Sequence, residues 1–183
     1  EEAIQRGCDA IEFDVQSIGN RFRIFHDDNF KRMFGLDIDT NKISEVEASK
    51  LVYPNLEKIP TLQQALDCVN GRVDVNVEIK SNHVATNIAS IVETYLQKPE
   101  WQHKNIILSC FSGATINMIR QFHLNLKLSY LLYEQYCNLE EIERIKDDYF
   151  KYNIHSLNLP LENVTPEIVE YCNSENICVY VYT

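Results

Sequence analysis

Apolar residues follow two different periods along this chain, and the two periods alternate. Short runs rich in β-branched and aromatic residues predict six strands, and longer stretches with apolar positions three or four residues apart predict helices between them. Strands that alternate with helices pair in parallel, so the pattern predicts an α/β fold. The predicted strands are Asp9–Gln16, Val73–Lys80, Asn105–Cys110, Lys127–Leu132, Ile154–Leu159 and Ile177–Tyr182.

One long connection separates the first two predicted strands. Residues 27–72 contain no predicted strand and are more numerous than such a connection normally needs. Two capping boxes, Ser44 with Glu47 and Thr61 with Gln64, each mark the start of a short helix there. We therefore predict a small helical insertion over residues 27–72.

The number of strand–helix units points to a barrel. No Gly-rich loop follows the first predicted strand, which disfavours a dinucleotide-binding sheet and favours a TIM (β/α)8 barrel. A full barrel takes about 250 residues for eight units, so this chain has room for about six. We expect residues 1–183 to form one barrel domain that lacks its first strand and its last βα unit.

Composition narrows the class of partner. The formal net charge is −10 and no cluster of Lys or Arg offsets it, so a nucleic-acid partner is excluded and a small-molecule substrate is favoured. No apolar run reaches the roughly 18 residues of a membrane span, so we expect no transmembrane segment in this chain. The six cysteines form no C-x-x-C pair, which favours reduced thiols and a cytoplasmic location.

Charged residues occupy one face of the first two predicted strands. Alternation sends Glu12 and Asp14 of the first strand, and Glu78 and Lys80 of the second, to the barrel interior. Three inward carboxylates form an all-oxygen set, which suits Mg²⁺ or Ca²⁺ better than zinc. Lys80 lies one pleat further toward the mouth, where its ammonium can meet an anionic substrate oxygen.

A short hairpin partner is predicted between these strands. Alternation in Arg21–Asp27 delivers His26 to the same rim, where an imidazole can transfer protons at neutral pH. The alternative is a purely structural role, in which these residues form an internal salt-bridge network and His26 is a structural histidine. Two charged pairs on successive strands favour a functional site.

Four segments and their spacing resemble a known family. They are Gly7–Gln16, Phe25–Asp28 with Arg32, Ile59–Leu62 and Val77–Lys80, followed more weakly by Ser109–Phe111, Asn158 and Val179–Thr183. Together they resemble the glycerophosphodiester phosphodiesterases, which share a TIM-barrel fold with the phosphatidylinositol-specific phospholipases. The resemblance covers nearly the whole chain.

The resemblance implies metal-dependent hydrolysis of a glycerophosphodiester to glycerol 3-phosphate and an alcohol. A lysophospholipase D or sphingomyelinase-D-like enzyme acting on a lysophospholipid, and a noncatalytic binding module derived from the same barrel, are the alternatives. The roles it implies are divalent-metal ligands for Glu12, Asp14 and Glu78, a catalytic histidine for His26, a phosphate contact for Lys80, and aromatic pocket positions for Phe111 and Tyr182.

This sequence departs from the family pattern at its start. The family's first strand carries a His-Arg pair, and these 183 residues begin after that point. We therefore expect the isolated 183-residue chain to show little or no turnover. An assay of that chain on glycerophosphocholine checks this expectation, and measurable release of glycerol 3-phosphate would contradict it.

Overall fold

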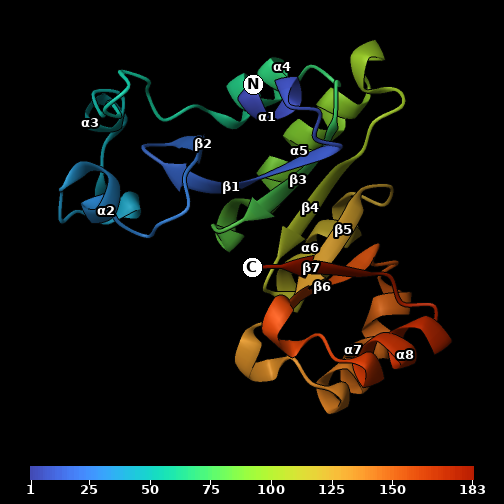
Figure 1. The fold of residues 1–183 in the computed structure, drawn as a ribbon. Helices are drawn as coiled ribbons and strands as arrows, with labels where there is room; N and C mark the ends of the chain where they lie inside the picture. The colour runs from blue at the N-terminus through green and yellow to red at the C-terminus, as the bar shows by residue number, and fades with distance from the viewer. The chain divides into compact units, whose positions relative to one another are not determined.

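The computed structural model describes residues 1–183, which divide into two compact units, Glu1–Ile106 and Ile107–Thr183. Figure 1 shows the course of the chain through its strands and helices. No helix combines the length with the apolar character that crossing a membrane requires.

The first unit holds a three-stranded arrangement in the order β2-β1-β3. Its strands are β1 (Ala10–Ile18), β2 (Arg21–Ile24) and β3 (Asp74–Ile79). Its helices are α1 (Glu2–Gln5), α2 (Lys31–Phe34), α3 (Glu45–Ala48), α4 (Leu62–Val69) and α5 (Ala85–Leu96). Single 3-10 turns lie at Thr40–Lys42, Asn82–Val84 and Pro99–Trp101.

Strands β1 and β3 run parallel, in the register that the alternation of side chains requires. Asp14 pairs with Glu78 and Glu12 with Asn76. Along β3, every second side chain is buried and apolar, whereas the residues between them are half-buried and polar. The predicted separation of one apolar and one charged face is therefore confirmed for this strand.

A tight turn reverses the chain after β1. Strand β2 pairs antiparallel with β1 from Val15 to Ile18, and Gly19 and Asn20 between them have φ of 58° and 64°. Two positive φ angles are those of a type I′ turn, whose twist matches that of the paired strands. A side chain at position 19 would also meet the backbone of Glu45 at 2.7 Å, so glycine is required there.

The segment of residues 27–72 (the 27–72 segment) shares a small core with the β1–β2 hairpin and the residue that follows it. Phe25, Phe30, Ile43 and Ile59 are buried together with Ile18, and their cluster extends to three half-buried residues, Phe34, Leu51 and Tyr53. Figure 1 shows α2 and α3 of this segment next to the β1–β2 hairpin. The core explains how so few helical residues hold a defined position.

Both predicted helices of the 27–72 segment are present. The capping boxes at Ser44 and Thr61 have both of their reciprocal hydrogen bonds, and α3 and α4 begin at the next residue. Helix α2, whose C-cap is Gly35 with φ of 69°, was not predicted from the sequence. Helix α2 is one turn long, and a single turn is too short for its apolar spacing to stand out.

The second unit contains four parallel strands in the order β4-β5-β6-β7. They are β4 (Ile106–Cys110), β5 (Lys127–Leu131), β6 (Ser156–Pro160) and β7 (Val179–Tyr182). The helices are α6 (Gly113–Phe122), α7 (Leu139–Lys151) and α8 (Pro166–Ser174), with 3-10 turns at Glu134–Tyr136 and Leu161–Asn163. The predicted alternation of parallel strand and helix is confirmed.

A buried guanidinium connects the loops at one end of the second unit. Arg120 on α6 is 9% exposed and has no carboxylate partner among its hydrogen bonds. Its side chain instead donates to five backbone carbonyl oxygens, those of His123, Leu124, Leu126, Tyr152 and Asn153. These carbonyls belong to the loops that follow α6 and α7, so one side chain fixes both loops.

We expect Arg120→Ala to lower the free energy of unfolding by about 3 kcal/mol, because several buried carbonyls lose their donor at once. Urea denaturation followed by circular dichroism measures the change. The matched control is Arg144→Ala, since Arg144 on α7 is exposed and pairs only with Glu141. The control should stay within about 0.5 kcal/mol of the unchanged protein. Equal losses in the two variants would show that the buried network contributes nothing specific.

Candidate active site

Three carboxylates meet at adjacent positions on β1 and β3. Oxygen atoms of Glu12, Asp14 and Glu78 all lie within 4.8 Å of one another. The parallel register causes this proximity, because it sets Asp14 directly beside Glu78 and leaves Glu12 one pleat earlier on the same face. The structure thus brings together the three residues that the alternation of β1 and β3 indicated.

Lys80 directs its ammonium into this cluster. Its Nζ lies 2.6 Å from Glu78 Oε1 and 3.3 Å from Asp14 Oδ1, and all three side chains are less than one quarter exposed. Burial works against the charged ammonium, but the hydrogen bond and charge of Glu78, followed by those of Asp14, outweigh it and raise the pKa of Lys80. One positive charge against three carboxylates leaves the cluster with a formal charge of −2.

The pKa of Glu12, one of the three carboxylates, is clearly raised. Desolvation, followed by the charges of Asp14 and Glu78, raises the pKa of Glu12 to about 7. The positive charges of Lys80 and His26 act in the opposite direction, which places His26 within electrostatic range of Glu12. A group that resists ionisation for these reasons gains most from a cation beside it.

The donor set fits a hard divalent cation. All of its ligand atoms are oxygens, and the uncompensated charge of the carboxylates matches that of one Mg²⁺ or Ca²⁺. The amide oxygen of Asn76, next to Glu12 in the register, is buried without a hydrogen-bond partner. Unsatisfied oxygen beside clustered carboxylates is costly in a purely structural network.

His26 lies two residues after the end of β2, and its imidazole ring is exposed to solvent. The side chain is 64% exposed, and its Nδ1 lies 2.8 Å from Asp27 Oδ1. Arg32 holds this carboxylate from the other side through two hydrogen bonds, of 2.7 and 2.8 Å. The hydrogen bonds from Arg32 and His26 lower the pKa of Asp27 to about 2.

Asp27 therefore stays ionised and accepts a hydrogen bond from the N–H group at His26 Nδ1. In the neutral imidazole this pairing leaves Nε2 as the nitrogen that can exchange a proton with another molecule. His26 was predicted from the sequence, and Asp27 and Arg32 belong to the same motif, but no role was predicted for either of them. The available signal was their spacing, in which a carboxylate directly follows the histidine and an arginine lies five residues after the carboxylate.

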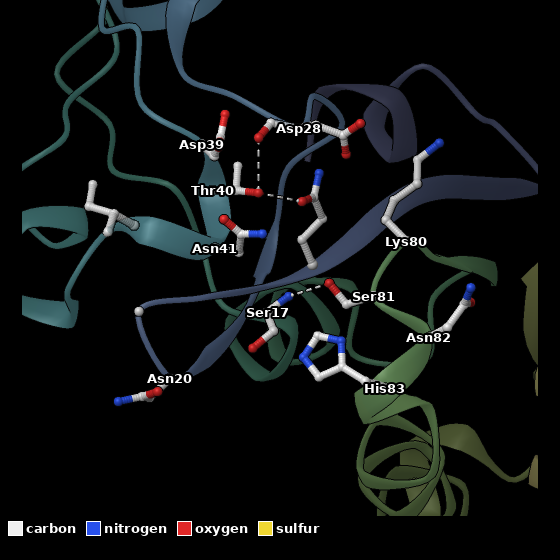
Figure 2. Close-up of a pocket in the computed structure, with 13 residues that line it drawn as sticks. Ser17, Asn20, Asp28, Asp39, Thr40, Asn41, Lys80, Ser81, Asn82 and His83 are labelled. Atoms are coloured by element: carbon white, nitrogen blue, oxygen red, sulfur yellow. Dashed lines mark hydrogen bonds between the residues drawn. The ribbon is translucent and has the colours of Figure 1, made fainter.

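A polar cavity of about 780 Å³ adjoins Lys80 within the first unit. It lies among the β1–β2 turn, the 3-10 turns at residues 40–42 and 82–84, and the loop after β3. Figure 2 shows the side chain of Lys80 extending away from Asn82 and His83. Lys80 is therefore part of the lining of the cavity, and its ammonium also contacts the carboxylate cluster.

The two predicted aromatic positions come together in the second unit. Phe111, directly after β4, stacks on Tyr133 with ring centroids 4.2 Å apart and meets Tyr182 of β7 edge-on at 5.9 Å. The Tyr182 hydroxyl donates to the carbonyl oxygen of Leu132 at 2.6 Å. The other five predicted site residues all belong to the first unit.

Solved structures share this fold at low sequence identity. An Oleispira antarctica phosphodiesterase, solved with the product sn-glycerol-3-phosphate, is 20% identical with a TM-score of 0.83, and the match covers 100% of this chain and 75% of that one. A glycerophosphodiester phosphodiesterase from Agrobacterium tumefaciens is 16% identical with a TM-score of 0.74 and coverages of 100% and 77%. One from Parabacteroides distasonis is 17% identical with a TM-score of 0.72 and coverages of 100% and 74%.

These likenesses confirm the predicted α/β fold of a partial barrel. No curated protein matches the sequence at a significant level. A family model does, and it spans residues 1–183. The chain belongs to the glycerophosphoryl diester phosphodiesterase family, whose members are phosphoric diester hydrolases.

Proposed function

We propose that the protein hydrolyses glycerophosphodiesters to glycerol 3-phosphate and an alcohol, and that it requires a divalent cation to do so. The observation that carries this proposal is the cluster of Glu12, Asp14 and Glu78 within 4.8 Å. Family membership supplies the reaction class. The Oleispira phosphodiesterase, with glycerol 3-phosphate as its product, supports a small-molecule glycerophosphodiester as the substrate.

The three carboxylates would hold the cation, Mg²⁺ or Ca²⁺. When bound, such a cation polarises a phosphoryl oxygen and neutralises charge that develops there. Lys80 offers a second positive charge next to the same carboxylates, 2.6 Å from Glu78, where it can stabilise the anionic phosphoryl group. We assign substrate-binding roles to Lys80, Phe111 and Tyr182 on this basis and on the family resemblance.

His26 would transfer a proton to or from the oxygen that attacks or leaves. The contact with Asp27 assigns this transfer to Nε2, because Nδ1 is engaged. Asp27 is itself kept in its ionised form by Arg32, so the hydrogen-bond acceptor for Nδ1 is present across the physiological pH range.

A second candidate function, hydrolysis of a lysophospholipid, is favoured by one feature of the 27–72 segment. A recess of about 290 Å³ there is lined mainly by apolar side chains, with three charged residues beside them: Leu36, Ile38, Ile43 and Leu51, together with Lys42, Glu47 and Lys50. An apolar recess of this size can take part of an acyl chain, whereas a glycerophosphodiester with a small alcohol has no use for it. Lysophosphatidylcholine as an alternative substrate separates the two candidates.

The first experiment is release of glycerol 3-phosphate from glycerophosphocholine by the full-length protein. We expect release that stops with chelator and returns with Mg²⁺ or Ca²⁺, and a fall in kcat of at least about 100-fold for Glu78→Gln, because a cation ligand is lost. Circular dichroism checks the fold, and Glu57→Gln, an exposed glutamate of the same unit, is the control.

Four results would count against the proposal. Turnover that persists in chelator refutes the need for a cation, and retained activity of Glu78→Gln refutes its place in the site. Activity on lysophosphatidylcholine alone would establish the second candidate. No turnover on either substrate would favour a noncatalytic binding module.

The role of Arg32 is tested by the titration of Asp27. Removing the guanidinium in Arg32→Met should raise the pKa of Asp27 from about 2 toward the ordinary value of 3.8, since Arg32 is the largest cause of the lowering. Carboxyl ¹³C NMR at successively lower pH measures the midpoint, which should occur at a higher pH in the variant. Lys31→Met is the matched control, because Lys31 is exposed and pairs with Asp37 instead. An unchanged midpoint in Arg32→Met would show that Arg32 does not control this carboxylate.

A further inference from the structure

Gln16 is a buried amide next to the candidate cation site. It follows Asp14 by two residues on β1 and is 3% exposed. Its Nε2 lies 3.1, 2.9 and 2.8 Å from the carbonyl oxygens of Phe25, His26 and Asp27. Three consecutive carbonyl groups thus point toward one amide group. Their contacts with it hold the chain in a curved path around His26.

The orientation of this amide has only one satisfactory solution. Carbonyl oxygens only accept hydrogen bonds, so Nε2 must face them, and a flipped amide would set oxygen against three oxygens. On the other side, Oε1 accepts from the hydroxyl of Thr40 at 2.9 Å. Thr40 is 5% exposed, so both partners of this hydrogen bond are buried.

Thr40 connects Gln16 to the 27–72 segment. Its backbone N–H donates to the carbonyl oxygen of Asp28 at 2.9 Å, and its hydroxyl also lies 3.3 Å from the same oxygen. Figure 2 shows Thr40 facing Asp28, with the dashed hydrogen bond between them. The chain is therefore held on both sides of His26, at Phe25 by β1 and at Asp28 by Thr40.

His26 depends on this backbone support because its ring has little other support. The imidazole is 64% exposed and its ring hydrogen bond goes to Asp27, which belongs to the same loop. The backbone N–H of Phe25 donates to the carbonyl oxygen of Asp14 at 3.0 Å, which gives the loop one fixed end on the strand of the carboxylates. Gln16 supplies the next three contacts along the loop.

We propose that Gln16 is a positioning residue for the proton transfer by His26, and that Thr40 fixes the Gln16 amide in its working orientation. This inference rests on the proposed function, in which His26 exchanges a proton with the substrate. Gln16 acts through the loop backbone and touches no reacting atom. Displacement of a catalytic group by about 1 Å can cost about 100-fold in rate.

A double-mutant cycle on kcat tests the inference in the full-length protein with glycerophosphocholine as substrate. Gln16→Met keeps the length of the side chain but donates no hydrogen bond. We expect kcat to fall by about 10- to 100-fold, with KM within about twofold. In the His26→Asn background, where no proton transfer by the imidazole remains, Gln16→Met should lower kcat by less than about twofold.

Thr40 provides a matched pair of variants for the case in which Gln16→Met does not fold. Thr40→Val keeps the shape and removes the hydroxyl, and we expect kcat to fall by about 3- to 10-fold. Thr40→Ser retains the donor and should keep kcat within about twofold of the unchanged protein. Thermal unfolding and calorimetric binding of Ca²⁺ to each variant report on the fold and on the carboxylate cluster separately.

Several results would overturn the inference. An unchanged kcat in Gln16→Met refutes it, and so does an equal fold-loss with and without His26, which would mean that Gln16 supports the cation site or the fold. Equal activity of Thr40→Val and Thr40→Ser removes the role of Thr40. If the unchanged protein releases no glycerol 3-phosphate, the proposed function fails and the inference fails with it. The unchanged protein could instead be active, with that activity lost in His26→Asn but kept in Gln16→Met. This result would refute the inference about Gln16 and leave the proposed function in place.

Discussion

Repulsion among three carboxylates is the interaction on which the site in the first unit depends. Glu12, Asp14 and Glu78 lie within 4.8 Å because the parallel register of β1 and β3 leaves them no alternative positions. Lys80 offsets part of the charge. Desolvation, followed by the charges of Asp14 and Glu78, still raises the pKa of Glu12. A folded chain that keeps such a cluster gives up stability at that point, which is reasonable where the missing charge is to come from a ligand.

The surroundings of His26, the residue proposed to transfer protons, are organised in the opposite manner. His26 is exposed and has only Asp27 as a ring partner, so no tight packing defines where its imidazole lies. The position of the ring is instead set by the loop that carries it, which is held by the buried Phe25 and by the amide of Gln16. An exposed ring on a fixed backbone can meet a substrate from solvent without losing its position, which a histidine on a mobile loop cannot do.

The sequence predicted those parts of the structure that depend on local periodicity. Alternation was sufficient to place Glu12, Asp14 and Glu78 on one face, and the capping boxes at Ser44 and Thr61 marked two helix starts correctly. Contacts between distant residues left no such signal. The bonds from Gln16 to the His26 loop, 9 to 11 residues away, and those from Arg120 to the carbonyls after α7 depend on the complete fold, and neither residue stands out from its neighbours in the chain.

Strand β1 connects the proposed cation site with the loop of His26, because one face of the strand carries Glu12, Asp14 and Gln16 at successive pleats. The first two face β3 and the proposed cation position, and the third faces the loop of His26. A shift of one residue in the pairing of β1 would turn all three to the other face at once. The register is held from both sides, by the parallel pairing with β3 and by the antiparallel pairing with β2 across the turn at Gly19. The glycine that permits this turn is therefore as much a condition of the site as the carboxylates themselves, although it contacts no part of it.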